Sequence, residues 1–172
     1  MWHYARGTAF LGKGQTTDAE QEFAKLNALM PDKSLDQPLF SPNTARAILT
    51  IAQEVLAGEL DASKKNYDSA IPHLERAVRL EDALVYTEPA EFHYPPRLSL
   101  GAILLAAGKP AEAETVYWED LRRNRESGWS LFGLMQALKA QGKNDDAALV
   151  EARLKKAWAR ADVTLTASRF GR

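Results

Sequence analysis

The sequence predicts an all-α protein built from about four pairs of antiparallel helices. Among its 172 residues, alanine (28) and leucine (22) far outnumber isoleucine (4) and valine (6), whereas β-sheet proteins depend on the second two residue types. In addition, four segments of the chain can be aligned with one another, and each reads as helix, tight turn and helix. Such internal similarity is typical of a solenoid, in which neighbouring helix pairs stack on one another.

The alignment is centred on four alanines that begin the second helix of each pair: Ala19, Ala70, Ala113 and Ala147. They lie 51, 43 and 34 residues apart, so the first two intervals contain insertions. Glycines precede three of them in the first helix, namely Gly7, Gly58 and Gly101. Small residues at both places let two helices approach closely.

On these residues the chain resembles the tetratricopeptide repeat (TPR) family, whose period is 34 residues. The first repeat matches the family pattern with Gly7, Phe10, Gly14, Ala19, Phe23 and Pro31. The third repeat matches it with Gly101, Leu104, Gly108, Ala113 and Tyr117. The second has Lys65 in place of the turn glycine, and the fourth has Met135 in place of the packing glycine. The resemblance implies a right-handed α-solenoid of four TPR-like pairs, similar to the C-terminal part of larger, uncharacterised bacterial TPR proteins.

Start signals agree with eight helices. Thr17 with Glu20 forms a capping box, Asn43 and Asn144 are preferred N-caps, and Pro110 is tolerated in a first turn. The expected helices cover residues 2–13, 17–29, 44–64, 67–84, 95–107, 110–124, 128–140 and 145–161.

The domain expected over residues 1–172 therefore divides into helix pairs, two loops and a tail. The pairs span about 1–31, 43–84, 95–125 and 128–161, the loops 32–42 and 85–94, and the tail 162–172. We expect the tail to be extended against the last helix, or disordered. Trp2 already lies in a helix with no polar capping segment before it, so we expect either a C-terminal fragment of a longer solenoid or self-association through the first pair.

Composition excludes several classes of function. With 22 basic and 23 acidic residues the formal charge is -1, which argues against nucleic acid as a partner. No apolar run approaches the roughly 20 residues of a membrane-spanning helix, so no membrane insertion is expected. No signal peptide is visible, and the absence of cysteine fits either the cytoplasm or the periplasm.

In TPR proteins the first helix of each pair lines a concave groove that binds peptides. Carried over to this chain, the resemblance places a largely apolar and aromatic set of residues there: Tyr4, Thr8, Leu11, Val55, Glu59, Ala62, Leu98, Ala102, Leu105, Trp129, Phe132, Gln136 and Lys139. Such a surface favours an amphipathic helix, an apolar segment or the protein's own tail as the occupant. The alternative is that about half of these residues are core between the repeats.

The insertion before the third pair contains an aromatic cluster, Phe92, His93 and Tyr94. Loop residues of this kind suit recognition of a partner. The alternative is a structural role. The prolines around the cluster stiffen the loop, and the rings of Phe92 and Tyr94 can cover an exposed side of the stack.

Five charged residues stand at positions that normally pack between repeats: Arg6, Glu54, Arg97, Asp120 and Glu151. Because an unpaired buried charge is costly, we expect them to form ion pairs between layers, such as Arg6 with Glu54 or Glu59. The alternative function follows from this set, since Arg6, Glu54, Glu59, His93 and Arg97 could bind a small polar ligand or a metal. The histidine spacing gives no metal signature, so no metal or other cofactor is expected.

No nucleophile, phosphate-loop or dinucleotide motif is present in the sequence. The preferred function is thus a non-catalytic module that binds a partner protein or peptide.

Overall fold

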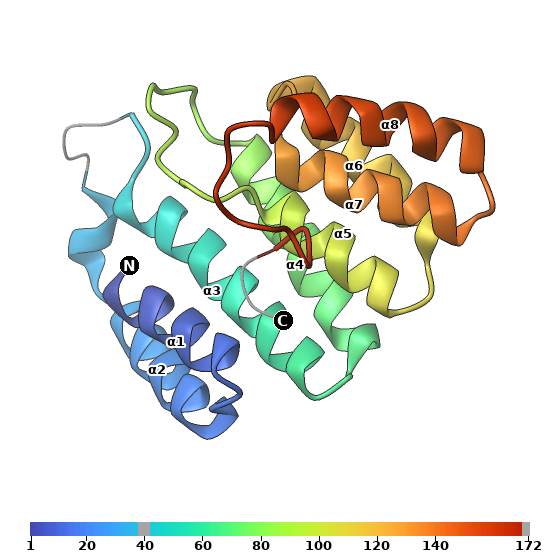
Figure 1. The fold of residues 1–172 in the computed structure, drawn as a ribbon. Coiled ribbons are helices and arrows are strands. Elements are labelled where there is room, and N and C mark those ends of the chain that lie inside the picture. Colours follow the sequence, from blue (N-terminus) through green and yellow to red (C-terminus); the bar gives the residue numbers. More distant parts are fainter. Residues whose placement is uncertain (38–41, 170–172) are drawn as a thin grey trace. The chain divides into compact units, whose positions relative to one another are not determined.

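The structure is a computed structural model that describes residues 1–37 and 42–169 (Figure 1). Within these residues all regular structure is helical, as the sequence predicts. The α-helices are α1 (Trp2–Gly12), α2 (Thr16–Leu29), α3 (Ala45–Ser63), α4 (Tyr67–Asp82), α5 (Pro96–Ala106), α6 (Pro110–Arg123), α7 (Gly128–Ala140) and α8 (Asn144–Ala157). Part of the expected loop 32–42 forms a short 3-10 helix, η1 (Lys33–Asp36), and positions 38–41 lie outside the described residues.

The chain forms two compact units, one from Met1 to Pro96 and one beginning at Arg97. In the first unit α1 packs against α2 and α3 against α4, and both α1 and α2 also contact α3. In the second unit α7 packs against α6 on one side and α8 on the other. Helices that follow one another along the chain therefore build each unit.

The turns inside the four helix pairs share one geometry. In each turn, a backbone amide just after the first helix donates a hydrogen bond to the carbonyl oxygen five residues earlier. The N–O distances are 2.9 to 3.0 Å, and the donors are Gln15, Asn66, Lys109 and Lys143. The residue before each of these donors has a positive φ: Gly14 (73°), Lys65 (61°), Gly108 (74°) and Gly142 (74°). This is the Schellman ending of a helix, which favours glycine at the left-handed position. Lys65 adopts the same conformation, so the departure of the second repeat from the glycine pattern leaves its turn unchanged.

Small residues pack where the repeat alignment places them. The four aligned alanines are almost completely buried, at 0% to 1% exposure: Ala19, Ala70, Ala113 and Ala147. A Cβ atom added to Gly58 would lie 3.1 Å from the carbonyl oxygen of Ala70, so α3 and α4 do approach through their backbones. Gly7 differs, because its nearest neighbour is the Leu56 side chain of α3 and not its own partner helix α2.

In the second unit, two glycines enclose the ring of Tyr117. A Cβ added to Gly101 of α5 would lie 2.4 Å from Tyr117 Cζ, and one added to Gly133 of α7 would lie 2.2 Å from the same atom. The Tyr117 side chain is fully buried between them, and burial raises the pKa of its hydroxyl. Met135, the residue aligned with the packing glycine, does not have this role, which falls to Gly133 two positions earlier.

The caps differ from those expected. Helix α2 begins at Thr16 without a side-chain cap, so the capping box at Thr17 is wrong. Thr44, rather than Asn43, caps α3 by accepting a hydrogen bond from the Ala47 amide at 3.2 Å. Asn144 is the first residue of α8 and not its cap. Side-chain caps are thus present at some of these helices, such as α3, and absent at others, such as α2 and α8.

The tail does not run along the last helix. The Trp158 indole donates a hydrogen bond to the Val163 carbonyl at 2.7 Å, which turns the chain away from the end of α8. The buried side chain of Ser168 then reaches the Tyr117 hydroxyl and the Leu98 carbonyl of α5. The described tail thus closes over α5 and α6, and its last three positions, 170–172, lie outside the described residues.

Candidate functional site

The expected groove residues of the first unit are mostly packed. Tyr4, Val55 and Glu59 are buried, and so is Ala62. Burial, reinforced by the negative charge of Glu59, raises the pKa of the Tyr4 hydroxyl. Thr8 is half-buried and donates a hydrogen bond to the Tyr4 carbonyl at 2.9 Å, and Leu11 is also half-buried. Little of this set is exposed to a partner.

The expected groove residues of the second unit are more open. Leu98 is buried, while Ala102, Leu105, Trp129 and Phe132 are half-buried and Gln136 and Lys139 are exposed. The Trp129 ring packs edge-on against Trp158, with ring centroids 5.9 Å apart. Lys139 pairs with Glu151 at 3.2 Å. The open part of this set is therefore the exposed side of α7.

The aromatic loop mainly fills space. Phe92 and Tyr94 are buried, and the Phe92 ring lies 5.8 Å from the ring of Tyr4. Asn43 holds the loop at its start, because its side chain accepts from the Val85 amide and donates to the Val85 carbonyl, both at 2.8 Å. His93 is exposed. Of the two roles considered for this cluster, the covering role describes the positions of both larger rings.

Two of the charged positions, Arg6 and Glu54, find partners inside their own helix pairs. Arg6 pairs with Glu22 of α2 at 3.6 Å, and not with a glutamate of α3 as expected. Glu54 is buried and pairs with two residues of α4, His73 at 2.6 Å and Arg76 at 3.2 Å. A shallow pocket of about 290 Å³ opens over this last group. Within residues 1–37 and 42–169, no three His, Asp or Glu side chains come together in a way that could hold a metal ion.

The cluster around Glu22 predicts a measurable pH dependence. A hydrogen bond from His3 at 2.6 Å and one from Lys25 at 2.9 Å lower the pKa of the Glu22 carboxyl from 4.5 to about 2. Because the folded chain holds this group ionised to lower pH than the unfolded chain does, its contribution to stability is present above pH 4.5 and is lost as the pH falls toward 2.

We expect Glu22→Gln to unfold in urea with a flatter dependence on pH between 4.5 and 2 than the parent chain. Glu75→Gln, an exposed position on α4, is the control and should keep the parental slope. Equal slopes for both variants would contradict the effect ascribed to Glu22.

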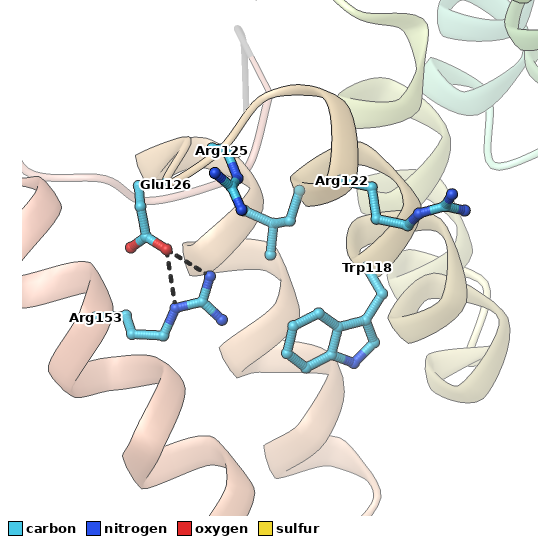
Figure 2. A pocket seen from close by; sticks show the side chains of 6 residues that line it. Trp118, Arg122, Arg125, Glu126 and Arg153 are labelled. Carbon is cyan, nitrogen blue, oxygen red and sulfur yellow. Dashed lines mark hydrogen bonds and ion pairs between the residues drawn. The ribbon is translucent and has the colours of Figure 1, made fainter.

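A pocket in the second unit lies between α6, the α6–α7 connection and α8. Its volume is about 520 Å³, and it is lined by Trp118, Leu121, Arg122, Arg125, Glu126 and Arg153. Figure 2 shows Arg153 facing Glu126 on one side and Trp118 on the other. The pocket therefore combines an aromatic wall with three guanidinium groups.

Contacts within the pocket hold the Trp118 ring in place. The Arg153 guanidinium carbon lies 5.7 Å from the centroid of the indole, a cation–π contact. Trp118 is nevertheless 42% exposed, so a large aromatic surface is fixed in position and still accessible.

The charges of the pocket are unequal. Arg153 donates from Nη2 and Nε to one oxygen of Glu126, at 2.7 and 3.2 Å, and Arg122 pairs with Glu119 at 2.8 Å. Of the carboxylates in the described part of the chain, none pairs with Arg125. The lining thus carries three cations and one anion.

None of these six residues is among the predicted groove or loop residues. Two signals in the sequence could have indicated them. One is a tryptophan one helical turn before an arginine, at positions 118 and 122, and the other is the presence of three arginines within residues 122–125. No local signal indicates Arg153, because it belongs to α8, which is distant in sequence and lies beside the pocket only after folding.

Searches against protein-family models and against curated proteins gave no match to this chain. None of the described helices is both long enough and apolar enough to cross a membrane.

Proposed function

We propose that this chain is a non-catalytic binding module of the TPR type, a right-handed solenoid of about four helix pairs that takes up a partner protein. The repeated Schellman turns and the buried alanines at the aligned positions support the TPR resemblance. The lack of any recognised catalytic motif in the sequence supports a binding role.

The observation that carries the proposal is the pocket around Trp118. Tryptophan and arginine are the residue types most enriched at the energetic centres of protein interfaces. Here they are brought together in an open pocket of about 520 Å³, and the indole is held by Arg153 before any partner arrives. A side chain fixed in advance loses less conformational entropy on binding. We therefore propose this pocket as the partner site in the second unit.

The concave groove is retained as a second surface only on α7, where Phe132 is half-buried and Gln136 and Lys139 are exposed. A ligand site in the charged layer has less support, because Arg6 and Glu54 each pair within a separate helix pair. The two surfaces of the second unit are separable by substitution.

The test uses peptides selected by the purified chain from an unbiased display library. We expect Trp118→Ala to weaken the selected peptides by at least ten-fold, since removal of a central aromatic residue costs about 2 kcal/mol or more. Binding is measured by fluorescence anisotropy, after circular dichroism has shown that the variant is folded.

Phe132→Ala is the matched control, because it removes an aromatic side chain from α7 in the same unit. Peptides lost with Phe132→Ala and unaffected by Trp118→Ala would move the site to the groove. Failure to select any peptide that binds the chain would contradict a peptide-binding function.

A further inference from the structure

Glu126 stands in an unusual backbone conformation next to Arg153. Its φ is 57°, in the left-handed region that residues other than glycine adopt at a cost. It lies in the short connection between α6 and α7, which is held on both sides. The Asn124 side chain donates to Asp120 at 3.0 Å, and Ser127 caps α7 by accepting from the Ser130 amide. The connection thus presents the Glu126 carboxylate to the pocket (Figure 2).

The ion pair that results is exposed and can be exchanged. The Glu126 side chain is 54% exposed and that of Arg153 is 37% exposed. Exposed pairs of this kind contribute little free energy, because water competes for both partners. A carboxylate from another molecule could therefore replace Glu126 on Arg153 without a large cost.

A replacing carboxylate would gain a second partner. Arg125 precedes Glu126 in the chain, also lines the pocket, and has no carboxylate of the described residues paired with it. A ligand carboxylate seated in the pocket could accept hydrogen bonds from Arg153 and Arg125 together. Charge-assisted bonds to two guanidinium groups are stronger than bonds to one.

From these contacts, and resting on the function proposed above, we infer that the pocket binds a glutamate or aspartate side chain in an acidic segment of the partner protein, and that Glu126 is a built-in competitor which this side chain replaces. An apolar neighbour in the segment packs on Trp118 and Leu121, while the displaced Glu126 turns to solvent.

The surroundings favour separate carboxylates over a continuous polyanion. Glu119, paired with Arg122, and Glu126 itself interrupt the basic surface on both sides of Arg125. A nucleic-acid backbone or an anionic membrane presents closely spaced charges and would meet these carboxylates. A peptide, by contrast, can place a neutral residue opposite Glu119 and opposite Glu126.

The experiment measures the affinity of two labelled nonapeptide sets, each with a central leucine and varied flanking residues. One set carries glutamates and the other carries glutamines at the same places. We expect the parent chain to prefer the glutamate set. Arg125→Ala and Arg153→Ala should each weaken that set by roughly ten-fold, with little effect on the glutamine set.

Glu126→Gln is the decisive variant, since it removes the competing charge while keeping the size of the side chain. It should bind the glutamate set about three- to five-fold more tightly than the parent chain, as expected for loss of an exposed ion pair. Glu112→Gln, which makes the same charge change in an exposed ion pair elsewhere on α6, should bind as the parent chain does.

Each other outcome overturns a part of the inference. Equal gains for Glu126→Gln and Glu112→Gln would show a general effect of net charge and no competitor. Equal affinity for the two peptide sets, still lost in Trp118→Ala, would exclude a carboxylate ligand while leaving the proposed peptide-binding function intact. Tighter, Arg153-dependent binding of an oligonucleotide or of phosphatidylserine vesicles would assign the pocket to those polyanions instead.

Discussion

Replacing Gly133 with alanine is expected to destabilise the second unit by about 2–3 kcal/mol, at the upper end of the cost of overpacking a core. The new methyl group would lie 2.2 Å from Tyr117 Cζ and 2.5 Å from its hydroxyl oxygen. The ring cannot retreat, because Gly101 leaves no space on its other side and the Tyr117 hydroxyl is tied to Ser168. Urea unfolding followed by far-UV circular dichroism measures the loss.

Two further variants test the cause of this loss. Gln136→Ala changes an exposed position of the same helix α7 and should alter the free energy of unfolding by less than about 0.5 kcal/mol. Tyr117→Leu shortens the obstructing side chain. In a chain that already carries Tyr117→Leu, adding Gly133→Ala should therefore cost almost no further stability. A Gly133→Ala chain as stable as its parent would contradict the packing of Tyr117 between the two glycines.

The sequence predicted most of the helices because the repeat pattern and composition are local signals. α7 coincides with its expected range, Gly128–Ala140, and α4 begins at Tyr67 as expected. The cap predictions at residues 17, 43 and 144 are wrong because residue type alone does not determine which side chain caps a helix. Asn43 illustrates the reason. Its side chain is hydrogen-bonded to the backbone of Val85, 42 residues later in the chain, and a local sequence motif does not reveal such a tertiary contact.

The same limit explains which packing residues were found. Gly101 and Tyr117 were both recognised through the repeat pattern, and the structure brings them into contact. Gly133 was not recognised, because in the alignment the corresponding position holds Met135. Its role depends on which face of α7 meets α6, and a shift of two residues around a helix cannot be inferred from a degenerate pattern.

Charge positions were predicted better than charge partners. Glu54, Arg97 and Asp120 are buried as their helix positions indicated, whereas the side chains of Arg6 and Glu151 are 42% and 37% exposed. The partner of each charge, however, depends on the length and direction of its side chain. Glu54, for example, extends to α4 and pairs there with His73. The pocket around Trp118 illustrates the same point, because Arg153 meets Glu126 across 27 residues of sequence. Periodicity shows that these side chains are on a surface and does not show which surfaces meet.

Asp120→Ala is expected to cost about 3 kcal/mol of the stability of the second unit, the second large effect. The Asp120 carboxylate is 1% exposed. It accepts hydrogen bonds from the Ser130 hydroxyl and from Asn124, so its removal leaves these donors without their acceptor inside the protein. It also removes a negative charge that interacts electrostatically with the buried guanidinium of Arg97.

Asp120→Asn separates the hydrogen bonds from the charge. Burial raises the pKa of the Asp120 carboxyl, against the opposing hydrogen bonds and nearby arginines. With a raised folded pKa, the folded chain holds the proton more tightly than the unfolded chain. This group's contribution therefore declines as the pH rises from the unfolded pKa of 3.8 through the folded value. Asparagine keeps an acceptor and has no such decline, so we expect Asp120→Asn to cost less stability than Asp120→Ala at neutral pH and to lose that part of the pH dependence.

Urea unfolding across this pH range measures both effects. Glu119→Ala on the same helix is the control, and its free energy of unfolding is expected to stay within about 0.5 kcal/mol of the parent chain. An Asp120→Ala chain no less stable than that control would show that Ser130 and Asn124 do not depend on the carboxylate.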